Sequence, residues 1–546
     1  MKNIPEFWTE ILILSIITVV IFSIGINIET GLTPDSVIKY LPVSENIFHE
    51  GLHWFIFNNS YETTVVPPLY EFFTVFFMIF GLDVNQSSGF VSLISLSLLA
   101  FPIFYIGKNI GGKYLGYISV LLCCSMKTMW DNGTSAMSEM LFIFLTYASI
   151  LFFIQYINNN RRSDIVLSSF FLVLANWTRW IGIFLLITYL SYLLIQLYFK
   201  NDKLINLILF SVISIPPVML LYLRNILIGS EIYSIGKTSF SFSELFINLG
   251  MFFFNVLWDF FPISPLMYFN EFLMEIYFTY FFNVLSIYDL AILIPFKLNF
   301  YYLLITACAI IIVISIMALI FYNYSKKIKI IISSFHDKKW PLLFVLIFTF
   351  YMGILFYTET TTSLSLIDSR YLSPLYPLFI ISCCKILLSV KNRHESGFRY
   401  GNSFITLIIV SFLIWQVSAT SVFLTEYGNG RGFSDPATMK GPAYQWLQDN
   451  WNHEDDIIIN DGLRVQIWKK SFFSNIKPLP NRNYPPGNFL INLSSGTYIV
   501  ITPVIGTKGP YRWVELKPYL CDRNRYDILL NETDEKIFRV LKSQVT

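Results

Sequence analysis

Stretches of about 20 apolar residues recur along this chain, from Trp8 to about Leu424, and they constrain its fold more than any other feature. A chain of 546 residues that is 55% hydrophobic and only 14% charged cannot fold as a water-soluble globule. Each apolar stretch is long enough to cross a bilayer as a helix. The sequence therefore predicts a polytopic α-helical membrane protein with about 11–13 transmembrane helices.

The composition changes after the last apolar stretch. Charged residues, Pro, Asn and Gly become frequent from Thr425 onward, which divides the chain into a membrane module, residues 1–424, and a soluble domain, residues 425–546. Ser434-Asp435-Pro436 predicts the start of a helix in that domain. Short β-strands are predicted at residues 456–460, 497–502, 526–530 and 536–541. We expect a small α/β domain without a phosphate-binding loop or nucleophile motif.

The distribution of Lys and Arg predicts the orientation, because these residues are retained on the cytoplasmic side. Arg161 with Arg162, the lysines at 326–339, and the basic residues at 391–399 should be cytoplasmic. Counting outward from these loops through spans predicted near 341–357, 371–389 and 403–424 places the soluble domain outside the plasma membrane, and the segment 29–64 also lies outside. That segment is rich in acids and has a single Lys39; its acids are Glu29, Asp35, Glu45, Glu50 and Glu62. The net charge of +2 and the lack of a basic tract exclude a nucleic-acid partner.

The count of crossings contains one conflict. Three apolar stretches, near residues 65–81, 89–107 and 114–126, precede a span at 138–157 that must begin outside, so one of the three does not cross. The stretch at 114–126 is the shortest and is the predicted non-crossing helix. Asp131 and Glu139 would then lie at the outer side, and a cavity is expected near residues 130–139. Residues 238–300 are expected to form an outer loop with interfacial helices and an even number of crossings.

Asp35 stands just beyond the first span. The string Thr33-Pro34-Asp35-Ser36 predicts a helix start that Asp35 caps, and Pro42 is predicted to interrupt that helix. Apolar residues continue through residue 55 in an amphipathic pattern suited to the membrane interface and its lipids. One interpretation of Asp35 is a solvated, capping loop acid. The other is a base that takes a proton from an acceptor at the membrane surface.

Several motifs resemble the C-type (GT-C) membrane glycosyltransferases, in particular the protein O-mannosyltransferases and lipid A aminoarabinose transferases. The matching strings are Asp35 to Tyr40, Pro67-Pro68-Leu69-Tyr70, Gly81, and Arg370-Tyr371-Leu372-Ser373-Pro374-Leu375-Tyr376-Pro377. The resemblance implies an inverting glycosyltransferase of the cell envelope. Such an enzyme moves a sugar from a polyprenyl-phosphate carrier to a glycan, lipid or protein acceptor at the outer membrane face.

The resemblance also implies roles for individual residues. Asp35 matches the catalytic acid of the first outer loop, and Asp131 or Glu139 falls where a second acid or metal ligand is often found. Arg370 matches the arginine of the family's RYxxPxxP string, and we expect its guanidinium to face the ionised Asp35 across an enclosed chamber at the membrane boundary. Ser36 stands where the family often has a second acid, which weakens the case for a metal at Asp35. A divalent cation can assist such a transfer, and the sequence leaves its presence open.

A cation must hold the departing lipid phosphate, and Val66 stands where the family often has a lysine. Arg370, Arg224 and Arg179 are the candidates, because a guanidinium matches a phosphate well. An arginine at a span end can instead extend to the lipid head groups. The candidate contacts with the substrate are aromatic: Tyr40, Tyr70, Trp177, Trp180 and Tyr371. Interfacial Trp residues also anchor helices without binding a ligand.

Two other classes of function stay open. A transporter or flippase would also be polytopic, but it usually has inverted repeats with interrupted helices and midplane charges, which this sequence lacks. A non-catalytic envelope scaffold would need neither Asp35 nor Arg370. Five of the six cysteines lie in apolar spans, and no CxxC spacing predicts a metal site.

Overall fold

The computed structural model describes most of residues 4–541. The residues outside this description are 1–3, 34, 59–62, 65, 200–202, 229–241, 261–339, 362–367, 392–400, 429–441, 452–456, 460–475, 479–489, 491–492, 502–512, 521, 523, 532–535 and 542–546. The predicted helix start at 434–436, the lysines at 326–339 and the predicted loop beyond residue 260 lie outside the described residues.

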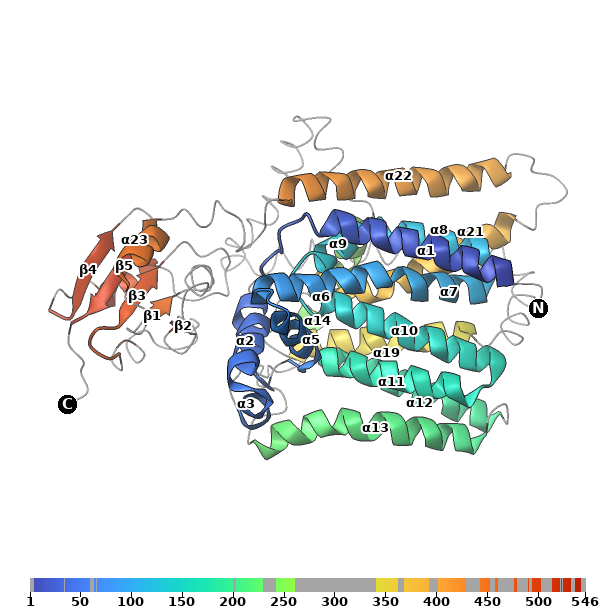
Figure 1. The fold of residues 1–546 in the computed structure, drawn as a ribbon, viewed down its shortest axis with the longest axis horizontal. Coiled ribbons are helices and arrows are strands. Elements are labelled where there is room, and N and C mark those ends of the chain that lie inside the picture. The colour runs from blue at the N-terminus through green and yellow to red at the C-terminus, as the bar shows by residue number, and fades with distance from the viewer. Residues whose placement is uncertain are drawn as a thin grey trace.

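A bundle of long apolar helices forms the larger part of the molecule (Figure 1). Its long helices are α1 (Ile4–Gly25), α6 (Val84–Leu98), α7 (Ala100–Gly111), α10 (Glu139–Asn159), α11 (Arg162–Thr178), α12 (Ile183–Tyr198), α13 (Leu204–Leu227), α14 (Phe242–Phe260), α19 (Trp340–Thr361), α21 (Tyr376–Lys391) and α22 (Gly401–Tyr427). In the described part of the chain, seven helical segments are long and apolar enough to span a bilayer. The protein is a multi-pass α-helical membrane protein.

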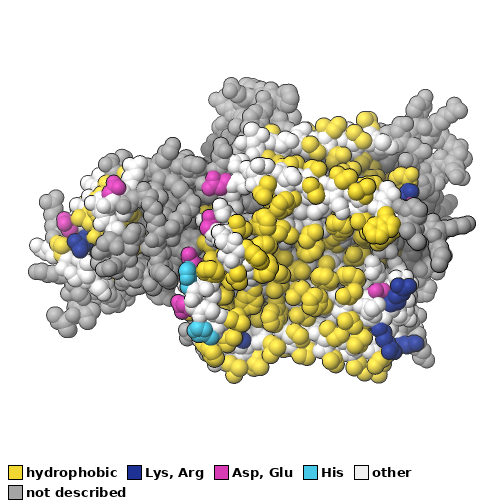
Figure 2. Space-filling view, viewed as in Figure 1, with side chains coloured by type: hydrophobic (Ala, Val, Ile, Leu, Met, Phe, Trp, Pro, Cys, Tyr) yellow, Lys and Arg dark blue, Asp and Glu magenta, His cyan; other side chains and the backbone are white. Residues whose placement is uncertain are grey.

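The two ends of the bundle carry opposite charges. At one end, which we call the basic end, Lys108 and Lys113 bind Glu10 and Glu6 of α1 at 2.5 Å and 3.1 Å, respectively. At the other, which we call the acidic end, a large surface hollow is lined by acids that include Glu29, Glu45 and Asp83. Figure 2 shows apolar side chains along the flank between these ends. This pattern matches helices that cross a membrane with the basic residues on one side.

The short helix α5 (Leu69–Ile79), and not the stretch at 114–126, is the one that does not cross. Tyr70 at its start bonds the carbonyl of Ser88 in α6, while Met78 near its end lines the same hollow as Glu29 at the acidic end. The 11-residue helix α5 therefore packs antiparallel to the first turns of α6. Since 11 residues rise only about 16 Å, this helix cannot span a bilayer.

Two short helices complete the crossing that the sequence analysis assigned wrongly. α8 (Lys113–Cys124) starts at the basic end, and α9 (Lys127–Gly133) finishes at the acidic end, where the Thr134 carbonyl accepts a hydrogen bond from Gly31 at 2.8 Å. Their 12 and 7 residues together are long enough to cross. The interruption between them, at 125–126, makes the apolar run look too short in the sequence.

The strands lie in a small α/β domain beyond the acidic end of the bundle (Figure 1). The sheet has the order β2-β1-β3-β5-β4, with β1 parallel to β2 and β3, and β5 antiparallel to β3 and β4. The elements are α23 (Pro442–Asn450), β1 (Ile457–Ile459), β2 (Ile476–Pro478), β3 (Tyr498–Ile501), α26 (Trp513–Leu520), β4 (Tyr526–Asn531) and β5 (Lys536–Val540). All four predicted strands are confirmed, and β2 and α26 were not predicted. The division at residue 424 stays a prediction.

Candidate active site

A capping box at the acidic end positions Asp35. The Thr33 hydroxyl accepts a hydrogen bond from the Ser36 amide at 3.2 Å, and the Ser36 hydroxyl accepts one from the Thr33 amide at 3.1 Å. These reciprocal bonds satisfy donors at the helix start. Asp35 itself makes no capping bond, so the prediction that it is the cap was wrong. Because Thr33 takes that role, the Asp35 carboxylate is available for other partners.

At Pro42, where the sequence predicts an interruption, the chain stays helical but changes its type of helix. A π-helical turn, η1 (Ser36–Tyr40), runs directly into α2 (Leu41–Glu50), and the Leu41 amide bonds the carbonyl of Ser36 five residues earlier. Pro42 lies in the first turn of α2, where an amide donor is not needed. A glycine turn then leads to α3 (Leu52–Phe57). These helices lie across the acidic end of the bundle (Figure 1).

The Asp35 carboxylate lies between two cations. Its Oδ1 accepts a hydrogen bond from Lys39 at 2.7 Å, and its Oδ2 accepts one from Arg370 at 2.5 Å. Arg370 belongs to the short helix α20 (Ser369–Leu372), which is followed by the 3₁₀ turn η4 (Ser373–Leu375). The prediction that Asp35 and Arg370 share one site is confirmed, although they touch directly and do not face each other across a space.

The site opens into a partly enclosed cavity of about 450 Å³. Its lining combines four aspartates with two cations: Asp35, Asp131, Asp259, Asp368, Lys127 and Arg370. Asn132 and Met137, which lie in the segment 131–137, also line the cavity. The cavity predicted near residues 130–139 is thus confirmed, and it contains Asp131 as expected.

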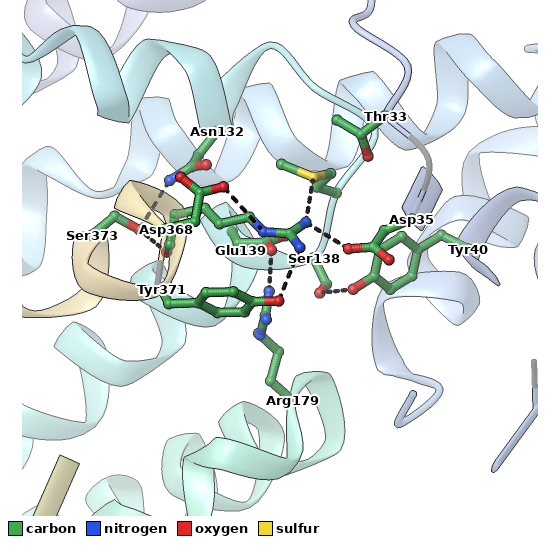
Figure 3. A network of polar contacts seen from close by, with 12 residues as sticks. Thr33, Asp35, Tyr40, Asn132, Ser138, Glu139, Arg179, Asp368, Tyr371 and Ser373 are labelled. Carbon is green, nitrogen blue, oxygen red and sulfur yellow. Dashed lines mark hydrogen bonds and ion pairs between the residues drawn. The ribbon is translucent and has the colours of Figure 1, made fainter. Parts of the chain in front are cut away.

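A second ion pair lies beneath this cavity (Figure 3). Arg179 follows α11 and binds Glu139 at the start of α10, and both side chains are largely buried. Tyr371 lies between the two arginines: its ring centre is 4.7 Å from the guanidinium carbon of Arg370 and 5.8 Å from that of Arg179. Its hydroxyl accepts a hydrogen bond from Arg370 at 2.9 Å. Glu139 and Arg179 therefore partner each other next to the Asp35 site.

The other aromatic candidates pack within the fold. Tyr40 is buried, lies edge-on to Tyr70 at 5.3 Å, and its hydroxyl accepts a bond from Ser138 at 2.9 Å. Tyr70 is fully buried against α6. Trp177 donates to the Pro217 carbonyl at 3.0 Å. The ring of Trp180 packs at a tilt against that of Tyr222, with the ring centres 4.9 Å apart. Their predicted contacts with a substrate stay predictions.

Arg224 lies apart from the Asp35 cavity. Its guanidinium donates to the carbonyls of Asn58 and Thr63 at 2.9 Å and 2.8 Å, and to that of Phe55. It also lies 4.2 Å from the centre of the Phe55 ring. Arg224 thus ties the segment after α3 to α13, and the structure does not bring it together with Arg370.

The surroundings of Asp35 determine its protonation. Burial alone would raise the pKa of Asp35, but the charges and hydrogen bonds of Lys39 and Arg370 outweigh it and hold that pKa well below its ordinary value. The carboxylate is therefore ionised at neutral pH. For nearby Asp368, burial raises the pKa although Arg370 opposes the effect.

Four residues of this site were not among the predicted site residues. Lys39 lies one helical turn after Asp35, a spacing that could have indicated an ion pair. Asp368, two residues before Arg370 in the sequence, forms an ion pair with it at 3.7 Å. Asp259 gave no signal in the sequence, because it reaches the cavity from the distant helix α14. Lys127 begins the same helix as Asp131 and lies one turn before it, a spacing that could have indicated a shared wall.

The residues around Asp35 do not match a metal site. Both oxygens of Asp35 are bonded to cations, and no three His, Cys, Asp or Glu side chains of the described residues are grouped so as to hold a metal ion. No step proposed below uses a metal ion.

Two solved structures are similar to this chain over nearly its whole length. Both are of ArnT, a lipid A aminoarabinose transferase, from Cupriavidus metallidurans. The structure bound to undecaprenyl phosphate has a TM-score of 0.53, is 11% identical, and the match covers 98% of this chain and 99% of that chain. The apo structure has a TM-score of 0.53 at 12% identity, with 98% of each chain covered.

At these identities the likeness shows the fold, so the protein has the GT-C fold. No family model matches the sequence, and no curated protein matches it.

Proposed function

We propose that this protein is a membrane glycosyltransferase that moves a sugar from a polyprenyl-phosphate carrier to an acceptor. The observation that carries this proposal is the ionised Asp35 carboxylate beside Arg370 on the wall of a partly enclosed cavity. A base, a cation for a phosphate and a partly enclosed space are what such a transfer requires. The shared fold adds support, because ArnT has been seen with undecaprenyl phosphate bound.

In the proposed reaction, Asp35 accepts the proton of an acceptor hydroxyl or amine. The freed electron pair of the acceptor attacks the anomeric carbon of the donor sugar. The bond from that carbon to the phosphate oxygen breaks, and its electrons leave with the lipid phosphate. Attack opposite the leaving group inverts the anomeric configuration. Asp131 lines the same cavity and is proposed to hydrogen-bond the acceptor.

Arg370 has two tasks in this scheme. In the structure it neutralises Asp35, and during transfer it stabilises the charge that develops on the lipid phosphate. The phosphate must therefore draw Arg370 away from Asp35, which makes Asp35 a stronger base as the donor binds. The Glu139–Arg179 pair holds Tyr371 from below, where its ring can contact the sugar.

We further propose that the acidic end faces the outside of the plasma membrane. The acids near Asp35 and the basic residues at the opposite end support this orientation. The C-terminal α/β domain would then be extracytoplasmic and would help to dock a glycan, lipid or protein acceptor.

Release of lipid phosphate by the purified protein tests the proposal. The substrates are undecaprenyl phosphates that carry mannose, glucose or aminoarabinose, each given with an acceptor extract of envelope lipids and proteins. We expect Asp35→Asn to lower release by about 10²–10⁴-fold, the usual contribution of a general base. Glu50→Gln is the matched control, because Glu50 is an exposed acid of the same segment.

The alternatives give different outcomes in the same assay. A flippase would move the intact sugar lipid across a vesicle membrane without releasing lipid phosphate, and a scaffold would do neither. Release that continues undiminished in the Asp35→Asn protein would refute the proposed role of Asp35.

A further inference from the structure

The cations near the cavity differ in whether they already have an anionic partner. Arg370 is bonded to Asp35, lies 3.7 Å from Asp368, and donates to the Tyr371 hydroxyl. The other two predicted phosphate ligands are also occupied. Arg179 binds the buried Glu139, and Arg224 donates to backbone carbonyls. A phosphate that binds Arg370 or Arg179 must compete with a carboxylate that the arginine already binds.

Lys127 is the exception among the described residues that line the cavity. It begins α9, and its ammonium lies 5.6 Å from the centre of the Phe423 ring in α22. In the described part of the chain it forms no ion pair, not even with Asp131 one turn later. Its aliphatic stem can pack on Phe423 while its charge reaches the cavity.

Three of the four aspartates that line the cavity with Lys127 are bonded to other side chains. Asp35 is bonded to Lys39 and Arg370, and Asp368 pairs with Arg370. The buried Asp259 accepts hydrogen bonds from the hydroxyls of Thr128, at 2.8 Å, and Tyr376. A lysine on the wall of a partly enclosed cavity gains most from an anion that the protein itself does not supply.

We infer that Lys127 binds the phosphate group of the polyprenyl-phosphate donor. This inference rests on the proposed function and adds to it the cation that receives the phosphate first. Lys127 can bind the phosphate without breaking an ion pair, and Arg370 joins when it leaves Asp35. The ammonium of a lysine is a compact charge with three donors and suits a phosphate that must later depart.

The test measures binding of undecaprenyl phosphate and of undecaprenol to the purified full-length protein in lipid nanodiscs at fixed salt. The two lipids differ only in the phosphate. Lys127→Met removes the charge and keeps an apolar side chain for Phe423, Lys127→Gln is a second uncharged variant, and Lys127→Arg keeps the charge. Lys113→Met is the matched control, because Lys113 is paired with Glu6 at the opposite end of the bundle.

We expect the wild-type protein to prefer undecaprenyl phosphate over undecaprenol, and each uncharged variant to lose about tenfold or more in affinity for the phosphate form. Affinity for undecaprenol should not change. Lys127→Arg and Lys113→Met should bind undecaprenyl phosphate nearly as well as the wild type. A melting temperature for each variant confirms that it is folded.

Two results would overturn the inference: wild-type protein that does not discriminate between the lipids, or an uncharged Lys127 variant with wild-type affinity for the phosphate. Failure of the proposed function is read separately, from the release of lipid phosphate and its dependence on Asp35. Lys127-dependent binding in a protein that releases no lipid phosphate would support the phosphate site while the transferase proposal failed.

Discussion

At the scale of single residues, the main feature is a carboxylate held by two cations. Lys39 and Arg370 keep Asp35 ionised and fixed in place, which a base needs. The same contacts weaken its attraction for a proton. The structure therefore corresponds to a resting arrangement, from which the arrival of a phosphate can increase the basicity of Asp35.

Changing Lys39 to Gln tests this balance. Lys39 is one of the two cations that lower the pKa of Asp35 against the effect of burial. Its loss raises that pKa, and because the base must be ionised, activity is lost at a higher pH than in the wild type. We expect the acid limb of the pH profile of kcat/KM to move up by about 1–3 pH units. Lys39→Arg should keep the wild-type profile, and an unmoved acid limb in Lys39→Gln would contradict the assignment.

The buried pair of Glu139 and Arg179 offers a second test at this scale. The side chain of Glu139 is 3% exposed and that of Arg179 is 18% exposed. Glu139→Gln leaves a largely buried guanidinium without its counter-charge, and we expect it to lower the free energy of unfolding by about 3–5 kcal/mol. The double variant Glu139→Gln with Arg179→Met should recover most of this loss. Thermal unfolding in the same detergent measures the stabilities of the single and the double variant. A Glu139→Gln protein as stable as the wild type would argue against a stabilising ion pair between Glu139 and Arg179.

At the scale of elements, close packing of α7 on α8 builds one wall of the bundle. A Cβ atom on Gly107 would lie 2.8 Å from the Cα atom of Gly116, so the two backbones touch. We expect Gly107→Ala to force the helices apart and to destabilise the protein by about 1–3 kcal/mol.

Gly353 of α19 is the matched control for this change. No heavy atom lies within 4 Å of a Cβ built there, so Gly353→Ala adds a methyl group into open space. It should be neutral or stabilising by up to about 1 kcal/mol, since Ala favours the helix. Melting temperatures of the two variants should therefore move in different directions, and equal shifts would contradict the packing argument.

The helices also differ in how well the sequence predicts their bounds and their path across the membrane. The spans predicted at 138–157, 341–357 and 403–424 match α10, α19 and α22 to within a few residues, because long uninterrupted apolar runs leave few alternatives. α5 and α8 were assigned the wrong way round. Their lengths differ by a single residue, and only contacts with α1 and α6 show which one crosses.

At the scale of the whole molecule, the charges of the two ends predict the orientation in the membrane. Glu50→Cys and Asn159→Cys, made in a Cys521→Ser background, place exposed thiols at the acidic and basic ends, respectively. A membrane-impermeant thiol reagent should label the first in intact cells and the second only after permeabilisation. The background protein must stay unlabelled. The reverse pattern would place Asp35 on the cytoplasmic side and exclude the proposed orientation.

The sequence by itself determined the membrane class, most of the spans, four strands of the small domain and the proximity of Asp35 and Arg370. Apolar length and strand periodicity are local properties, and the Asp35 and Arg370 motifs could be matched to a known fold. The tertiary structure alone decided that Thr33 is the cap, that α5 does not cross, and that Lys127 and Asp259 reach the cavity of Asp35. These features depend on contacts between residues far apart in the chain, and the sequence next to a residue does not identify its distant partners.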